Sequence, residues 1–211
     1  MAIPGWFNVI SSVYNIISFL VAGAISFLGY KAYKLLKDKK YLNFSISFLF
    51  ITLSFIVFML TNLLVYINLG AGAVKILNII NWGFISYALL TVAGFFLLVL
   101  LTFKIRNIKF ISLLSLAIIA ALIFSDFIMT FIQMFHIILF ALTLALSFHY
   151  YKNCTEKKTT NSKLVFSAFS LIMISHIFSF ASGANEVIFA IGNTVLVLGY
   201  ILLLATILRL K

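Results

Sequence analysis

Residues 15–31, NIISFLVAGAISFLGYK, form an uncharged, largely apolar run that ends at a lysine. Six further runs of this kind occur in the chain, and most charged residues lie between them. The seven runs cover residues 6–30, 42–67, 82–103, 110–125, 127–151, 164–182 and 187–208. Hydrophobic residues make up 64% of the 211 residues and charged residues 9%, which is more apolar surface than a water-soluble domain can bury. The sequence therefore predicts an all-α membrane protein: one transmembrane domain over residues 1–211, a bundle of seven helices.

Each run is expected to be a helix, because a backbone inside hydrocarbon must satisfy its own amides and the alternating strands of a barrel are not seen. The run 110–125 is the shortest of the seven. Its 16 residues cover roughly 24 Å at ~1.5 Å per residue, less than the ~30 Å hydrocarbon core. We expect this fourth helix either to be buried among its neighbours or to thin the bilayer locally.

The basic residues fall almost entirely on one side of the predicted membrane. The first, third and fifth connections and the C-terminal tail hold 14 of the 15, and only Lys75 lies on the other side. Because excess positive charge marks the cytoplasmic side, the N-terminus is predicted outside and the C-terminus inside. A composition rich in Ile, Phe, Lys and Asn is typical of an AT-rich prokaryotic genome, and the protein is therefore predicted to lie in a plasma membrane. Topology and anionic lipid at the cytoplasmic face then account for the net charge of +11, and nucleic-acid binding is not expected.

The opening stretch recurs later in the chain. A shift of 121 residues aligns it with residues 136–152, HIILFALTLALSFHYYK, with 8 identities in the 16 positions that begin at Ile16. The same shift aligns the second run with the sixth, and a shift of 105 aligns the third with the seventh. We infer two three-helix repeats, 6–103 and 127–208, joined by the short fourth helix. Because three is odd and one span intervenes, both repeats enter the membrane from the same side, as parallel repeats do.

This 3+1+3 plan resembles that of the SWEET sugar facilitators and the wider PQ-loop group, over the whole chain but in architecture only. The resemblance implies an N-out, C-in bundle. The prolines of those families are absent, because the sole proline is Pro4, so a hinge mechanism built on helix prolines is not carried over. Retinal proteins also have seven spans, but no lysine lies within 187–208 to hold the chromophore.

Polar residues inside the spans are the candidate ligand-binding set, because they are costly in hydrocarbon and tend to face the interior of a bundle. The candidates are His136, His176, Asn15, Asn81 and Asn193. No carboxylate lies at the centre of a span, which argues against a pump built on a buried acid. The alternative is that these residues, with the small residues around them, only hold the helices together.

His136 and His176 are the sharpest candidates. Counted from the outer ends of their helices, they lie roughly 15 and 10 Å deep, so they can share a layer. Their repeat counterparts are Asn15 and Phe55, so both break the pseudosymmetry, as residues of one off-axis site would. Two imidazoles on facing helices can ligate a haem iron or another transition metal. We expect no cofactor, and keep haem or metal ligation by this pair as the alternative to simple hydrogen bonding.

The sequence favours no enzyme class. A zinc motif, an embedded carboxylate that would orient a catalytic histidine and a Gly-rich phosphate loop are all missing. Two functions from different classes remain. The first is a small-solute facilitator with a midplane site between the repeats, which predicts a central cavity. The second is a sensor, or a membrane subunit that docks on a larger complex, which predicts a tightly packed bundle; self-association into a homo-oligomer also stays open.

Overall fold

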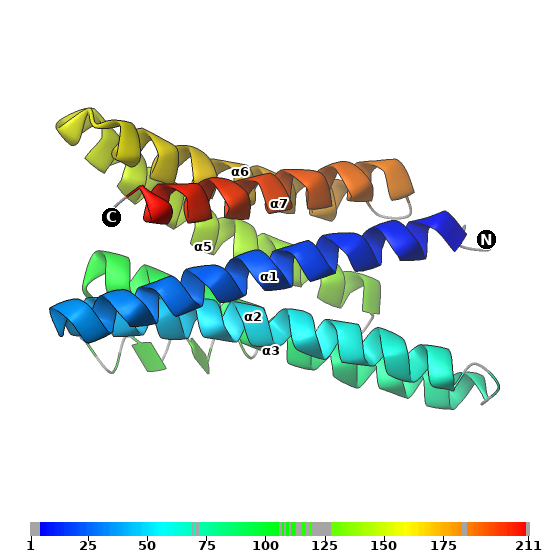
Figure 1. Cartoon of the computed structure of the whole chain (residues 1–211). Coiled ribbons are helices and arrows are strands. Elements are labelled where there is room, and N and C mark those ends of the chain that lie inside the picture. The colour runs from blue at the N-terminus through cyan, green and yellow to red at the C-terminus, as the bar shows by residue number, and fades with distance from the viewer. Residues whose placement is uncertain are drawn as a thin grey trace.

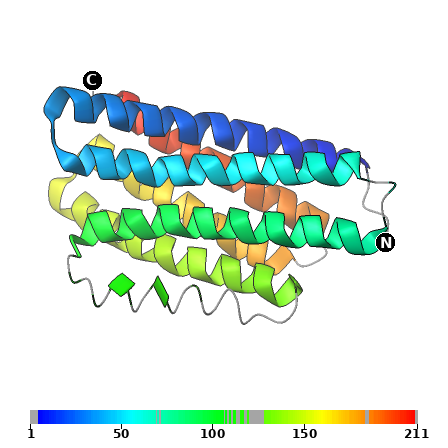
Figure 2. The same cartoon turned by 90° about the horizontal axis from the view of Figure 1, so that it is seen from below.

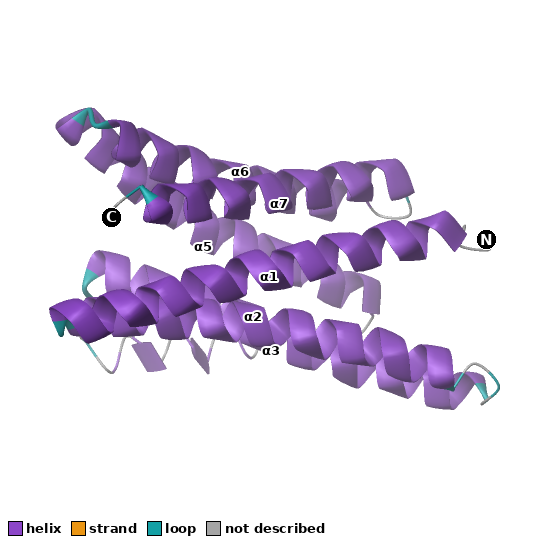
Figure 3. Ribbon diagram, viewed as in Figure 1, coloured by secondary structure: helices purple, strands orange, loops and turns teal. Residues whose placement is uncertain are grey.

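The structure is a computed structural model, and it describes residues 5–68, 70, 72–105, 107, 109, 111–112, 115–116, 119, 128–182 and 185–209. The long elements among these residues are all α-helices (Figure 3). They are α1 (Gly5–Leu36), α2 (Lys39–Ile67), α3 (Ala73–Phe103), α5 (Ile128–Lys157), α6 (Thr160–Ser182) and α7 (Glu186–Leu208). All six are long and apolar enough to cross a membrane.

The prediction of seven membrane helices is wrong: the described part of the chain has six helices of membrane-spanning length, not seven. The predicted fourth helix covers residues 110–125, and most of these lie outside the described residues. Its 16 residues fall short of the ~20 that an apolar helix needs to span a bilayer, and this is the physical reason that the segment was the weakest of the seven.

The six helices form a closed ring. Each packs against the next in the order α1, α2, α3, α5, α6, α7, and α7 packs against α1. Helices α1, α3, α5 and α7 all run in one direction, and α2 and α6 run in the other (Figures 1 and 2). We call the end at which α1, α3, α5 and α7 finish the basic end, because the lysines that follow α1, α3 and α5 gather there.

Aromatic rings fill the inside of this ring of helices. The side chains of Phe48, Phe95, Phe135, Phe169 and Tyr200 are each at most 1% exposed. The outside is apolar as well, with large side chains such as Phe27, Trp82 and Phe148 more than two-thirds exposed. A bundle that is apolar on both its inner and its outer surface is the arrangement expected where lipid and not water surrounds the helices.

One helix contact occurs twice, at positions related by the two shifts found in the sequence. Gly94 of α3 packs on Ile51 of α2, and a Cβ on Gly94 would lie 2.6 Å from Ile51 Cγ1. Gly199 of α7 packs on Ile172 of α6, and a Cβ on Gly199 would lie 2.7 Å from Ile172 Cγ1. Residue 199 is 94 plus 105 and residue 172 is 51 plus 121, so the two contacts are equivalent.

A second pair of contacts joins the two halves of the ring in the same related way. Phe95 of α3 meets His176 of α6 edge to face, with ring centroids 6.3 Å apart and an interplanar angle of 89°. Tyr200 of α7 meets Phe55 of α2 with centroids 6.2 Å apart and an angle of 87°. The division into repeats stays a prediction, and these matched contacts are what two repeats related by a twofold axis would produce.

Candidate functional site

His136 of α5 and His176 of α6 lie side by side inside the bundle. Their ring centroids are 5.8 Å apart and their planes are tilted by 35°. The expectation that the two histidines share a layer is therefore confirmed. Their role as ligands to a solute, a haem or a metal stays a prediction.

The surroundings of this pair are aromatic, with His176 buried and His136 half-buried. His176 is 5% exposed, and its ring meets that of Phe95, while the ring of His136 lies 5.0 Å from that of Phe135. Nδ1 of His136 and Nε2 of His176 are buried and have no hydrogen-bond partner among the described residues. A haem held between these imidazoles would need a slot for its porphyrin, and Phe95 and Phe135 fill the space beside the pair.

The three candidate asparagines are half-buried on other helices. The amide of Asn193 donates to the carbonyl of Phe189 in its own helix α7 at 3.1 Å. Next to Asn15, the hydroxyl of Tyr14 bonds Thr194 Oγ1 at 2.6 Å and so ties α1 to α7. Neither the asparagines nor the histidine pair line the cavity described below. The structure thus brings the two histidines together, places the asparagines on other helices, and leaves both sets outside the lining of that cavity.

A cavity of about 1260 Å³ opens at the basic end of the bundle and is lined by residues of all six helices. Its walls are mainly apolar. They include Leu28 of α1, Ile46 of α2, Leu97 of α3, Val165 of α6 and Leu203 of α7. Both predicted repeats contribute to the walls, and most of the lining residues belong to α1, α2 and α3.

Aromatic rings form the inner floor of this cavity. Tyr150 of α5 and Phe169 of α6 stack face to face, with centroids 5.0 Å apart and planes 2° from parallel. Phe44 of α2 also lines the cavity and packs on the buried ring of Phe48 at 4.9 Å. Phe169 also belongs to the buried core, and Tyr150 and Phe44 pack against that core, so the cavity borders the core at this floor.

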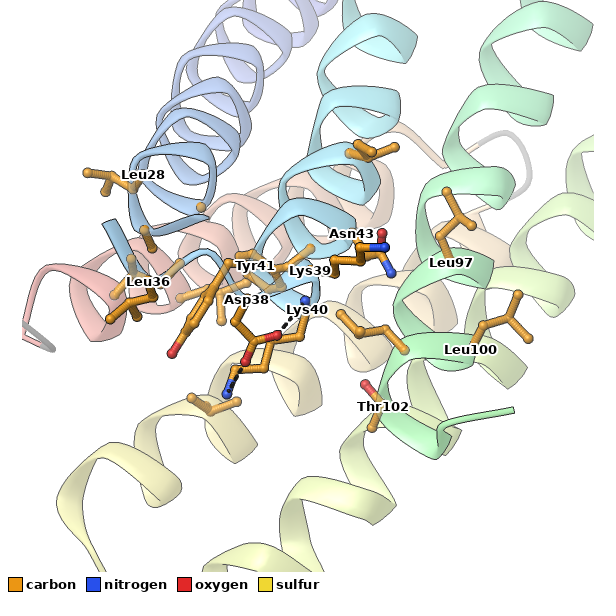
Figure 4. Close-up of a pocket in the computed structure, with 18 of the residues that line it drawn as sticks. Leu28, Leu36, Asp38, Lys39, Lys40, Tyr41, Asn43, Leu97, Leu100 and Thr102 are labelled. Carbon is orange, nitrogen blue, oxygen red and sulfur yellow. Dashed lines mark hydrogen bonds and ion pairs between the residues drawn. The ribbon is translucent and has the colours of Figure 1, made fainter. Parts of the chain in front are cut away.

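The rim of the cavity is positively charged. Lysines 31, 39, 40 and 104 line it, together with the single carboxylate of Asp38. Figure 4 labels Asp38, Lys39 and Lys40 among the lining residues. Asp38 is the N-cap of α2: its carboxylate accepts from Lys40 N at 2.9 Å and lies 3.1 Å from Lys40 Nζ. These two bonds, the backbone one first, lower the pKa of Asp38. The carboxylate is therefore ionised at neutral pH and paired with Lys40. The other three lysines of the rim are not paired with this carboxylate.

The half of the bundle beyond the cavity floor is closed by a cluster of aromatic rings from α2, α3 and α5. Phe84 meets Phe131 at 5.5 Å and Phe135 at 5.7 Å between ring centroids. Tyr87 meets Phe135 at 5.5 Å and Phe58 at 5.2 Å. Packed rings of α2, α3 and α5 therefore lie between the cavity at the basic end and the other end of the bundle.

Sequence reasoning missed this cavity, because the lysines around it were interpreted only as a topology signal. One feature of the sequence could have indicated it. Leu28, Ala32 and Leu35 recur at helical spacing across the predicted end of the first span at residue 30, and all three line the cavity. The stripe extends α1 to Leu36 and so builds a wall beyond the predicted span.

The six apolar helices make this chain a multi-pass membrane protein. Among the described residues, no group of three or more His, Cys, Asp or Glu side chains is placed to hold a metal ion. No family model, curated protein or solved structure matches the chain.

Proposed function

We propose that the protein is a facilitator for a small solute, and that the solute enters through the cavity at the basic end. The observation that carries this proposal is the cavity of about 1260 Å³ with a lining from all six helices. A facilitator needs such a chamber between its repeats, whereas a scaffold or docking subunit does not. The volume exceeds the ~300–1,000 Å³ of ordinary ligand pockets, as suits a vestibule that narrows inward.

On this proposal, the solute site lies nearer the basic end than the midplane site that the sequence suggested. The vestibule ends at Tyr150 and Phe169, and the histidine pair lies apart from it. We take the stacked pair as the inner gate: separating the two rings would connect the vestibule to the core. With the basic end on the cytoplasmic side, as the lysine distribution predicts, the structure corresponds to a state open to the cytoplasm.

The charge of the rim favours anionic solutes. Four lysines and one aspartate surround the entrance, and Asp38 is already paired with Lys40. A cluster of like charge at a cleft raises the local concentration of counter-ions and repels ions of its own sign. Apolar walls below the rim suit the carbon skeleton of an organic anion. The same lysines would also attract anionic lipid headgroups at this face.

Flux measurements in liposomes test the proposal. Swelling of proteoliposomes is compared in isosmotic neutral polyols, in potassium salts of small carboxylic acids with valinomycin to carry the potassium, and in thiocyanates of organic cations, whose anion crosses lipid unaided. We expect saturable entry of the carboxylates above that in protein-free liposomes. Leu97→Trp should slow this entry because Leu97 lines the cavity, and Leu89→Trp on the same helix should not, because Leu89 is 40% exposed on the outside. Equal rates with and without protein for all three solute classes would refute the proposal.

The cluster of aromatic rings from α2, α3 and α5 favours one alternative function, that of a sensor or a membrane subunit of a larger complex. Rings that pack as tightly as those of Phe84 and Phe135 resemble a structural core more than a pore. Native mass spectrometry of protein taken gently from its own membrane distinguishes the two. A stoichiometric partner chain in place of a bare monomer or a symmetric homo-oligomer would favour the alternative.

A further inference from the structure

We propose that His136 and His176 together bind a soft monovalent metal ion of the Cu(I) class. The proposal begins from two buried ring nitrogens, Nδ1 of His136 and Nε2 of His176, that have no hydrogen-bond partner among the described residues. Buried polar atoms are normally paired, so two unpaired atoms on touching rings indicate that something is bound between them.

The separation of the rings suits one bridging atom. A ring nitrogen lies about 1.1 Å from its ring centroid, so rings with centroids 5.8 Å apart bring their nitrogens no closer than about 3.5–3.6 Å. That exceeds the ~3.2 Å limit of a direct N–H···N bond. At this closest approach of the nitrogens, two metal–nitrogen bonds of ~2.0 Å span the gap at an angle of roughly 120–130°. Turning either ring by 180° exchanges its nitrogens and carbons but leaves the centroids in place, so this result does not depend on which ring atom is assigned as nitrogen.

The charge of the surroundings selects a monovalent ion. The described acidic residues all lie at helix ends: Asp38 before α2, Glu156 in the last turn of α5, and Glu186 at the start of α7. None of them can neutralise an ion beside the histidine pair. The desolvation cost of an ion grows with the square of its charge, so a divalent ion would pay about four times the cost of a monovalent one here.

Among monovalent ions, the two imidazole ligands favour a soft metal ion over an alkali ion. Alkali ions prefer oxygen ligands, whereas imidazole nitrogen suits copper and related soft ions. The rings of Phe95 and Phe135 pack against His176 and His136 and so limit the access of water to such an ion. With two protein ligands at this angle, one coordination position stays open.

This inference is independent of the transport proposal, because it concerns binding that can be measured without any flux. Silver(I) is the probe, since it is stable in air and shares the ligand preferences of Cu(I). The measurements use the Cys154→Ser chain, because the free thiol of Cys154 would bind the same ions.

Equilibrium dialysis of the purified detergent-solubilised protein should give one silver ion per chain. His176→Phe and His136→Asn, which introduce the residues found at the repeat-related positions 55 and 15, should each weaken binding at least tenfold. His149→Phe is the matched control: it removes the remaining imidazole of α5, which lines the cavity at the basic end, and should leave binding unchanged.

X-ray absorption of the silver complex of the Cys154→Ser chain keeps the proposal testable if the histidine variants do not fold. Nitrogen neighbours of the metal are expected. Three results would each overturn the proposal: sulfur neighbours only, an unaltered silver affinity in folded histidine variants, or no bound silver in the Cys154→Ser chain.

Discussion

Gly94 and Gly199 show how single residues set the distance between helices in this bundle. A Cβ at Gly94 would lie 2.7 Å from the carbonyl oxygen of Ser47, and one at Gly199 would lie 3.1 Å from that of Ala168. Backbone atoms cannot yield as the end of a side chain can. In a membrane, where hydrophobic burial does not drive helices together, such close approach supplies the packing that holds them.

We expect Gly94→Ala to destabilise the fold by about 1–3 kcal/mol, because the added methyl overpacks the contact between α2 and α3. Gly199→Ala should cost less, since its nearest backbone atom is further away. Gly23→Ala is the control: it is also inside a helix, and its Cβ would meet only Thr52 Cγ2 at 3.6 Å. Thermal unfolding in detergent measures all three. Equal midpoints for Gly94→Ala and Gly23→Ala would show that the helices do not pack as described.

The pairing of α1 with α2 depends on two crossed hydrogen bonds. Ser26 Oγ donates to the carbonyl of Ser45 at 2.9 Å, and Ser45 Oγ donates to the carbonyl of Ser26 at 2.8 Å. Because each acceptor is backbone, either bond survives the loss of the other side chain. The α5–α6 pair is joined differently, through the hydroxyls of Ser147 and Ser170 at 2.8 Å.

A pair of double-mutant cycles separates these two arrangements. Ser26→Ala and Ser45→Ala should each cost about 0.6 kcal/mol and add almost independently. Ser147→Ala and Ser170→Ala share one bond, so the second change should cost much less than the first. Unfolding free energies in mixed detergent give both coupling energies. A larger coupling in the first cycle than in the second would contradict the crossed geometry.

The lysines at the helix ends around the cavity lead to a prediction about the entry of carboxylates. Lys104 follows α3 and lines the cavity, whereas Lys157 ends α5 at the same end of the bundle without lining it. Lys104→Glu and Lys157→Glu change the net charge equally. We expect Lys104→Glu to reduce carboxylate entry into proteoliposomes several-fold, and Lys157→Glu to have little effect, since charge near the entrance acts most strongly on the solute. Equal inhibition by both would assign the effect to surface charge in general.

At the scale of the molecule, much of the framework could be predicted from hydropathy alone, since a long apolar run without charge has few alternatives to a spanning helix. The length of residues 110–125 was the weak point, and the described chain has six such helices instead of seven. The layer of His136 and His176 followed from counting residues along antiparallel helices. The cavity did not follow, because it depends on which aromatic side chains interlock inside the ring, as Tyr150 and Phe169 do, and hydropathy does not distinguish inner from outer faces when both are apolar.

Water access along α3 tests the cavity and the orientation of the whole molecule together. In the Cys154→Ser background, Leu97→Cys places a thiol in the cavity wall, Leu89→Cys places one on the outer surface, and Ala88→Cys places one in the core. Maleimides react with the hydrated thiolate, so we expect only Leu97→Cys to be labelled by a membrane-impermeant maleimide. If the basic end is cytoplasmic, labelling should occur in inside-out vesicles and not in intact cells. Labelling from the opposite side would reverse the predicted orientation and keep the cavity. Labelling of Leu97→Cys and Ala88→Cys at equal rates would show that the aromatic floor does not hold water out of the core.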